Sequence, residues 1–419
     1  MRRIYSLLLY ALLPLILLRL YWRGHKNPDY RRRWAERFGY FPALPGQGYL
    51  WVHAVSVGET RAALPLIRAL LQRYPNHPVL VTTTTPTGSQ QVRSILRNRV
   101  KHVYLPYDMP GAVARFLTRA RPILAVIMET ELWPNLFRQC AMAGIPLVVA
   151  NARLSPRSAR HYGKLPGFTA EVLTHTTLIA AQGESDAAQF RALGAPRVRV
   201  VGNLKYDLTL PPGLPARGRE LRRMLGENRP VWIAASTHSG EDEQVLDAFS
   251  TLRARFTDML LLLVPRHPER FTPVALLCER RGLNVVRRSE QRPCTADTAV
   301  YLGDSMGELL LFYSAADIAF VGGSLIPQGG HNPLEAALLG LPVLLGPHLF
   351  NFAEISQSLL SAHAAWQVAD AKELAQAVAH WLDDEPARQE AGQRAKALLD
   401  ANRGALDALL DCINGLVRI

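Results

Sequence analysis

Two loops in the first half of the chain carry carboxylates suited to acid–base chemistry. The segment 56–59 (Ser-Val-Gly-Glu) ends in Glu59, and a second loop holds Glu129 and Glu131. A carboxylate beside a hydroxyl group can act as a general base, which is typically worth about 10² to 10⁴ in rate. A structural alternative stays open: Glu59 can complement the dipole of the helix that it begins. Likewise, the other two carboxylates can cap a helix that begins at Pro134.

Segments in the second half suit a phosphorylated ligand. Arg266 ends an apolar run, where its guanidinium can clamp a phosphate with two hydrogen bonds. The segment 303–309 is expected to open a helix whose free amides can hold an anion. In the glycine-rich segment 322–335, Glu335 falls on the first turn of a helix starting near Asn332, where it can accept from both hydroxyls of a ribose. This spacing also resembles a capping box, and the two interpretations are compatible.

Alternating strands and helices must position these loops. Short apolar runs predict parallel strands at 49–54, 79–83, 102–105, 123–128, 147–150, 178–181, 231–235, 259–264, 318–321 and 342–345. Runs that are apolar at consecutive positions are typical of strands covered by helices on both faces. We therefore predict two doubly wound α/β domains. Their candidate loops, including one that ends in His238, follow the carboxyl ends of strands and face a cleft.

The N-terminus carries an apolar run, Ile4 to Leu18, followed by a basic collar. The first forty residues hold nine lysines and arginines against two acidic residues, a net +7 of the chain's formal +13. Such a collar attracts anionic headgroups, and Tyr21 and Trp22 suit the headgroup depth. The run contains Pro14 and is shorter than the roughly 20 residues of a full span, so an interfacial anchor and a crossing are both open.

Composition shifts divide the chain into five parts. A Pro/Gly-rich stretch at 211–215 indicates an interdomain connection, and Pro386 suits the start of a final helical stretch with a break at Gly404. We predict, in order, a membrane anchor at 1–22, an N-terminal α/β domain at 23–210, a linker at 211–225, a C-terminal α/β domain at 226–385, and helices at 386–419 that pack back toward the N-terminal domain.

Composition and motifs disfavour several classes of protein. The chain has 419 residues and four scattered cysteines, without the spacing of a zinc site or the density of a disulfide scaffold. The basic excess sits on the N-terminal segment, and no nucleic-acid-binding module is recognisable. The phosphate-binding, dinucleotide-binding and nucleophile-elbow glycine motifs do not occur either, which disfavours NTPases, dehydrogenases and hydrolases.

Taken together, the motifs resemble those of the 3-deoxy-D-manno-octulosonic acid (Kdo) transferases of lipid A assembly, which are two-domain glycosyltransferases of the GT-B architecture. The resemblance extends over essentially the whole chain. Besides the anchor and its collar, it rests on the segments 53–59, 86–88, 128–135, 150–155, 264–267, 322–335 and 346–348.

This resemblance implies a CMP-Kdo donor, a lipid IVA acceptor and a place on the cytoplasmic side of the cell inner membrane. It implies that Glu59 is the general base and that CMP is bound by Pro265, Arg266, Met306, Gly307, Glu308, Asn332, Pro333, Leu334 and Glu335. We expect no cofactor and no metal, because the phosphate of CMP leaves without an acid and the loops hold no Asp-x-Asp pair. A single displacement on a β-linked donor would give an α product with inversion.

Three alternatives stay open. The first is another membrane-associated GT-B enzyme that uses a UDP-sugar, since the segment 306–308 cannot by itself separate cytosine from uracil. The second is a nucleotide-sugar epimerase, which would have no use for residues 1–37. The third is a non-catalytic lipid-binding or scaffold protein, which would not need Glu59.

Overall fold

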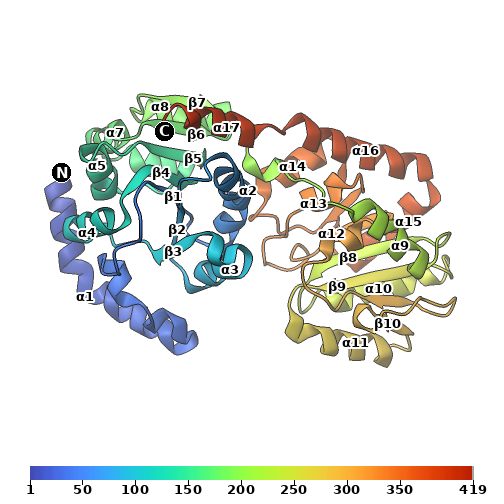
Figure 1. Ribbon diagram of the computed structural model, residues 1–419. Coiled ribbons are helices and arrows are strands. Elements are labelled where there is room, and N and C mark those ends of the chain that lie inside the picture. The colour runs from blue at the N-terminus through green and yellow to red at the C-terminus, as the bar shows by residue number, and fades with distance from the viewer. Residues whose placement is uncertain (418–419) are drawn as a thin grey trace. The chain divides into compact units, whose positions relative to one another are not determined.

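The computed structural model describes residues 1–417 and divides into two compact units (Figure 1). Unit 1 combines Met1–Asp207 with the end of the chain from Asn402, and unit 2 is Leu208–Ala401. Each unit is built around its own seven-stranded parallel sheet. The predicted pair of doubly wound α/β domains is confirmed.

The sheet of unit 1 has the strand order β3-β2-β1-β4-β5-β6-β7. Its strands are β1 (Tyr49–His53), β2 (Val79–Thr83), β3 (Lys101–Tyr104), β4 (Pro122–Met128), β5 (Leu147–Ala152), β6 (Leu178–Ala181) and β7 (Val198–Val200). The chain first builds outward from β1 to β3 and then returns to β4 on the other side of β1. The carboxyl ends of β1 and β4 therefore flank the point where the strand order reverses, which is where ligands of such sheets bind.

Helices cover both faces of this sheet. They are α2 (Val57–Arg73), α3 (Pro86–Leu96), α4 (Pro110–Ala120), α5 (Pro134–Met142), α6 (Pro156–Tyr162), α7 (Pro166–Thr174), α8 (Glu184–Ala192) and α17 (Ala405–Asn414). Along β1, Leu50 and Val52 enter the hydrophobic core under α2 and α17, whereas Tyr49 and Trp51 enter the core on the opposite face. This alternation explains why all five residues of β1 are buried.

The N-terminal apolar run forms most of helix α1 (Arg2–Lys26), which continues through Pro14. Within the described residues it is the one helix whose length and composition suit a membrane span. Most of its apolar side chains are exposed, and Trp22 is 76% exposed. The helix lies beside α5 (Figure 1), where Arg2 Nη1 and Ser6 Oγ donate to Asn135 Oδ1 at 3.1 and 3.2 Å.

The sheet of unit 2 has the order β10-β11-β9-β8-β12-β13-β14. Its strands are β8 (Val231–Thr237), β9 (Leu260–Pro265), β10 (Val285–Arg287), β11 (Val300–Leu302), β12 (Ile318–Val321), β13 (Val343–Leu345) and β14 (Ala365–Gln367). Here the strand order reverses between β8 and β12. The loops after β11, β9, β8 and β12 leave the same edge of the sheet, which brings the predicted donor segments together.

The helices of unit 2 are α9 (Leu214–Leu225), α10 (Asp242–Arg253), α11 (Phe271–Arg280), α12 (Leu309–Tyr313), α13 (Leu334–Leu338), α14 (Ala353–Ser361), α15 (Ala371–Asp383) and α16 (Glu385–Ala401). Side chains of α10, α11 and α15 pack with the buried strands in one hydrophobic core.

The division of the chain differs from the predicted one at two places. Along the chain, the boundary between the units lies between Asp207 and Leu208. Most of the expected linker at 211–225 is helix α9, whose Leu221 is buried within unit 2. The prolines and glycine that indicated a linker lead into this helix, because Gly213 takes the left-handed conformation at its start.

The last helical stretch breaks at Gly404, as predicted, and its two parts belong to different units. Helix α17 packs in unit 1, whereas α16 belongs to unit 2 and packs against α13 and α15. A Cβ on Gly392 of α16 would lie 2.0 Å from the Gly340 carbonyl oxygen, so only glycine permits this close approach.

Candidate active site

Glu59 lies in the first turn of α2, at the carboxyl end of β1. Its carboxylate accepts from the Val55 N–H at 2.8 Å and from Ser56 Oγ at 3.2 Å, while Ser56 caps the helix. Glu59 therefore does have the structural role considered from the sequence, at the start of a helix. Its side chain is only partly buried, so the carboxylate is fixed in place but still open to a ligand.

A cavity of about 220 Å³ opens beside Glu59 at the carboxyl ends of β1, β4 and β5. It is lined by Glu59, Glu129, Thr130, Glu131, Arg153, Ser155 and Ser158. The two carboxylate loops predicted from the sequence thus come together at the strand-order reversal of unit 1. Arg153, Ser155 and Ser158 were not predicted as site residues. The sequence signals for them were their position after a strand and, for Arg153 and Ser155, the segment 150–155 that contributes to the family resemblance.

The electrostatics of this cavity favour a proton acceptor that works near neutral pH. Burial raises the pKa of Glu59 to about 7, and the carboxylates of Glu129 and Glu131 add to the rise, against the hydrogen bond from Val55. Burial also raises the pKa of Glu131. Glu129 adopts a left-handed backbone with φ of +57°, which is uncommon for a residue other than glycine.

In unit 2, a backbone hydrogen bond connects the carboxyl end of β8 with the loop after β9. Pro265 is buried at the end of β9, and the next residue, Arg266, donates its N–H to the Thr237 carbonyl oxygen at 2.9 Å. His238, directly after β8, lies with its Nε2 2.8 Å from Nε2 of His331 in the glycine-rich segment. The predicted guanidinium and the glycine-rich segment therefore belong to one edge of the sheet.

The segment 306–308 lies on the same edge, with Met306 exposed and Gly307 in the left-handed conformation at φ +82°. The Glu308 carboxylate accepts from Arg288 at 3.0 Å and from Ser305 Oγ at 2.6 Å. The bond from Arg288 is the main cause that lowers the pKa of Glu308. The segment 303–309 leads into a helix, as predicted, and this helix is α12, which begins at Leu309 and has five residues.

The segment 332–335 caps the short helix α13. Asn332 Oδ1 accepts from the Leu334 N–H at 3.2 Å, and the helix begins at Leu334, two residues later than predicted. Pro333 is buried and Leu334 is fully buried, so these two residues offer a ligand no side chain. Glu335 is partly buried on the first turn of the helix, as predicted.

A buried carboxylate that sequence reasoning missed holds two donor loops together. Glu241 accepts from the backbone N–H groups of Gly323, Ser324 and Leu325 at 2.6 to 3.0 Å. It also accepts from the N–H of His238 at 3.1 Å. Nothing in the sequence separated this residue from an ordinary acidic residue at a helix start. The structure shows that it fixes the loops after β8 and β12 relative to each other.

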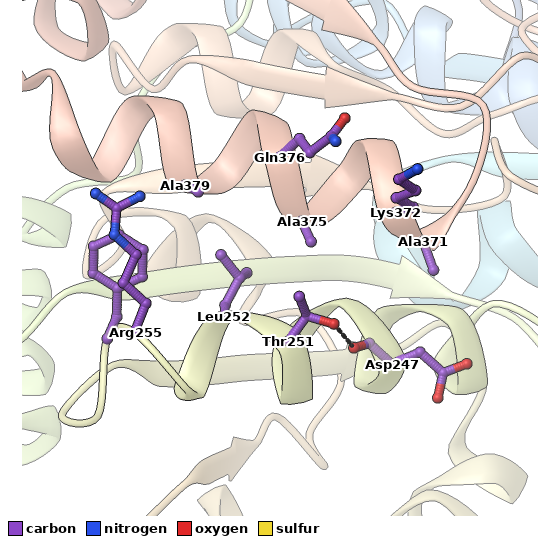
Figure 2. Close-up of a pocket in the computed structure, with 10 residues that line it drawn as sticks. Asp247, Thr251, Leu252, Arg255, Ala371, Lys372, Ala375, Gln376 and Ala379 are labelled. Atoms are coloured by element: carbon purple, nitrogen blue, oxygen red, sulfur yellow. Dashed lines mark hydrogen bonds between the residues drawn. The ribbon is translucent and has the colours of Figure 1, made fainter.

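A larger cavity of about 510 Å³ lies between α10 and α15. Figure 2 shows the small side chains of Ala371, Ala375 and Ala379 facing α10, where Thr251 Oγ1 donates to the Asp247 carbonyl oxygen. It contains none of the loop residues at the strand ends. Across residues 1–417, no three or more His, Cys, Asp or Glu side chains are grouped so that they could hold a metal ion.

The two parallel-sheet units, each with its loops at the carboxyl ends of the strands, define the GT-B fold. A solved structure of MurG from Acinetobacter baumannii shares this fold, with a TM-score of 0.57 and 11% identity over 88% of this chain and 100% of that one. A family model described as glycosyl transferases group 1 matches residues 243–398.

The remaining comparisons specify the family. A family model described as 3-deoxy-D-manno-octulosonic-acid transferase matches residues 32–208. The chain is 44% identical to a 3-deoxy-D-manno-octulosonic acid transferase of Haemophilus influenzae, with 98% of each covered, and 38% identical to one of Bordetella pertussis, again with 98% of each covered. The chain belongs to the Kdo transferase family. It is a glycosyltransferase that transfers Kdo in lipopolysaccharide biosynthesis.

Proposed function

We propose that the chain transfers Kdo from CMP-Kdo to lipid IVA, with inversion and with Glu59 as the general base. The observation that carries this proposal is the cavity at the end of β1, where a carboxylate with a pKa of about 7 is held by two hydrogen bonds. A base with a pKa close to the operating pH combines a useful ionised fraction with a strong drive to accept the proton.

The chemistry needs only this one proton acceptor. A hydroxyl of the acceptor sugar attacks the anomeric carbon of Kdo, Glu59 takes the hydroxyl proton, and the bond to the CMP phosphate breaks. The leaving phosphate is stabilised as an anion by donors in unit 2, of which Arg266 is the charged one in the predicted CMP site. The other CMP contacts are proposed for Pro265, Met306, Gly307, Glu308, Asn332, Pro333, Leu334 and Glu335, with buried Pro333 and Leu334 contributing only their backbones.

We further propose that α1 attaches the enzyme to the cytoplasmic surface of the inner membrane without crossing it. The first turn of α1 is bonded to Asn135. Three residues beyond its other end, Asp29 accepts from Gln90 Nε2 of α3 at 2.7 Å, and further along Arg33 donates to the His102 carbonyl oxygen at 3.2 Å. A helix held at both ends by one folded unit cannot place those ends on opposite sides of a bilayer. Its exposed apolar side chains and arginines suit the interface instead.

The test is a reconstitution with defined substrates. Purified full-length protein in detergent is incubated with lipid IVA and CMP-Kdo, and the lipid product is analysed by mass spectrometry. We expect lipid IVA to gain Kdo while CMP is released, and UDP-sugars to give no product. Unmodified lipid IVA in the presence of intact, folded enzyme, or transfer from a UDP-sugar, would contradict the proposal.

A further inference from the structure

Three histidines meet at the strand-order reversal of unit 2, and the proposed reaction leaves them without a role. His238 follows β8, His267 follows β9, and His331 lies in the glycine-rich segment after β12. The rings of His238 and His331 are stacked, with centroids 5.1 Å apart and an angle of 7° between their planes. The ring of His267 meets that of His238 edge-on at 5.4 Å. We call these three residues the histidine cluster.

The contact between His238 and His331 fixes how many protons the pair can hold there. Their Nε2 atoms lie 2.8 Å apart, which is a hydrogen-bond distance. One Nε2 must therefore donate a proton and the other must accept it, because two protonated nitrogens would repel each other at this distance. The pair can be neutral, or it can carry one positive charge when the donating ring is protonated on both nitrogens.

The surroundings of His238 keep its own ring neutral as long as no anion is present. Burial, together with the neighbouring charges of His267, Arg266 and Arg270, lowers the pKa of His238 to about 4. The two carboxylates that follow His238 in the chain, at the start of α10, are engaged elsewhere. Glu241 accepts four backbone N–H groups, one of them from His238, and Asp242 is paired with Arg270 at 2.5 Å.

An anion placed against the cluster would reverse this balance. Its negative charge offsets the cations of the loop after β9, so the proton affinity of the His238–His331 pair rises. A doubly protonated ring can then donate a charge-assisted hydrogen bond, which is about twice as strong as a neutral one. Because Arg266 is the neighbour of His267 and part of the proposed CMP site, a donor bound there would bring its anionic groups to this edge of the sheet.

We propose that the histidine cluster binds an anionic group of the sugar donor and takes up one proton as it does so. This inference rests on the proposed function, which supplies a nucleotide-sugar donor with two anionic groups, the phosphate and the sugar carboxylate. Imidazole gains a proton from solvent on binding and returns it when the anionic product leaves. Donor affinity should therefore strengthen as the pH falls, by up to about tenfold per pH unit, until the free cluster itself becomes protonated near the low pKa of His238.

The experiment is calorimetry of ligand binding between pH 5.5 and 7.5 in buffers of different ionisation enthalpy, which counts the protons taken up. Full-length wild type, His238→Gln and the control His380→Gln, which alters a histidine on α15 stacked against Trp366, are titrated with CMP and with CMP-Kdo. We expect wild type and His380→Gln to take up close to one proton more than His238→Gln. Taking this difference removes the titration of the CMP phosphate itself. If wild type takes up more protons than His238→Gln already with CMP alone, the bound anion is the phosphate. If the difference in proton uptake is present only with CMP-Kdo, the bound anion is the carboxylate.

Equal proton counts in wild type and His238→Gln, with both still binding, would overturn the inference and leave the proposed function intact. Failure of wild type to bind either ligand would overturn the proposed donor and the inference with it. Nitrogen NMR of the imidazoles in wild type gives a reading that is independent of any variant. A histidine pKa that rises on CMP-Kdo binding supports the inference, and imidazole signals whose titration is unchanged by the ligand refute it.

Discussion

Kdo transfer should depend on pH through the carboxyl group of Glu59. Only the ionised carboxylate can accept the hydroxyl proton, and the pKa of this group is raised to about 7 by burial. About half of the enzyme is then active at pH 7 and roughly one hundredth at pH 5, because the ionised fraction falls tenfold per pH unit below the pKa. The rate should rise with pH through 7 and level off above about pH 8.

Two substitutions test whether the rise of the rate with pH, the acidic limb of the profile, is caused by the titration of Glu59. Glu59→Gln keeps one oxygen that can accept from the Val55 N–H and gains an amide that can donate to Ser56 Oγ, but it has no useful proton affinity, so transfer should fall by at least about 10² at the plateau. Glu131→Gln removes a neighbouring negative charge that contributes to the raised pKa, so the limb should move to lower pH. Glu171→Gln, at an exposed position of α7, is the matched control and should leave the profile unchanged.

The stability of the Glu59→Gln variant separates catalysis from folding. The pKa of Glu59 is higher in the folded chain than its ordinary value of 4.5, so ionisation costs stability as the pH rises from about 4.5 through 7. Removing the charge should raise the thermal midpoint at pH 8 while activity is lost. Initial rates of single turnover on detergent-dispersed lipid IVA, with excess enzyme, are the assay. A flat profile from pH 5.5 to 8, or near-normal transfer by the folded Gln variant, would refute Glu59 as the base.

Three further outcomes are expected. Arg266→Ala should weaken CMP binding by about 1.5 to 3 kcal/mol in calorimetry, the cost of a hydrogen bond to a charged group, and unchanged affinity would remove this residue from the donor site. Deletion of residues 1–22 should convert the enzyme from one that needs detergent for extraction to one released by 1 M salt, where screening cuts the reach of charges to about 3 Å; continued need for detergent would place the anchor elsewhere. Gly346→Ala should lower the thermal midpoint because its Cβ would lie 2.2 Å from the Ser324 backbone, whereas Gly167→Ala, with nothing within 4 Å, should raise it slightly; equal effects would contradict the close approach.

The strands that sequence reasoning found and missed differ in length and position. Strands of four residues or more, such as β4, carry enough consecutive apolar residues to be recognised. Strands β7, β10, β11 and β14 have three residues each and were missed, and all of them except β11 lie at a sheet edge. Strand β13 is equally short but was found, because it lies in the predicted run 342–345. Helix α9 was missed because the prolines and glycine before it outweighed its own amphipathic pattern.

In the candidate site, too, some features could be predicted from the sequence and others could not. Residues that follow a strand, such as Glu59 and Arg266, could be placed from the sequence because parallel strands present their carboxyl ends at one edge. The contacts of Glu241 with Ser324 and of His238 with His331 could not be placed, since they depend on β8 and β12 being neighbours although three helices and three strands separate them along the chain. Strand order is set by the packing of the whole unit and leaves no local pattern.

The return of α17 to unit 1 has a consequence for how the protein is made. Leu409 and Ile413 complete the hydrophobic core over α2, and Asp207 accepts from the N–H groups of Gly404 and Leu406 at 2.7 and 2.6 Å. All of unit 2 is translated between these partners. At about 5 to 20 residues per second, the ribosome needs about 10 to 40 s for those roughly 200 residues. During that time the nascent first unit lacks the side chains of α17 in its core, so its folding is completed only after α17 has been translated.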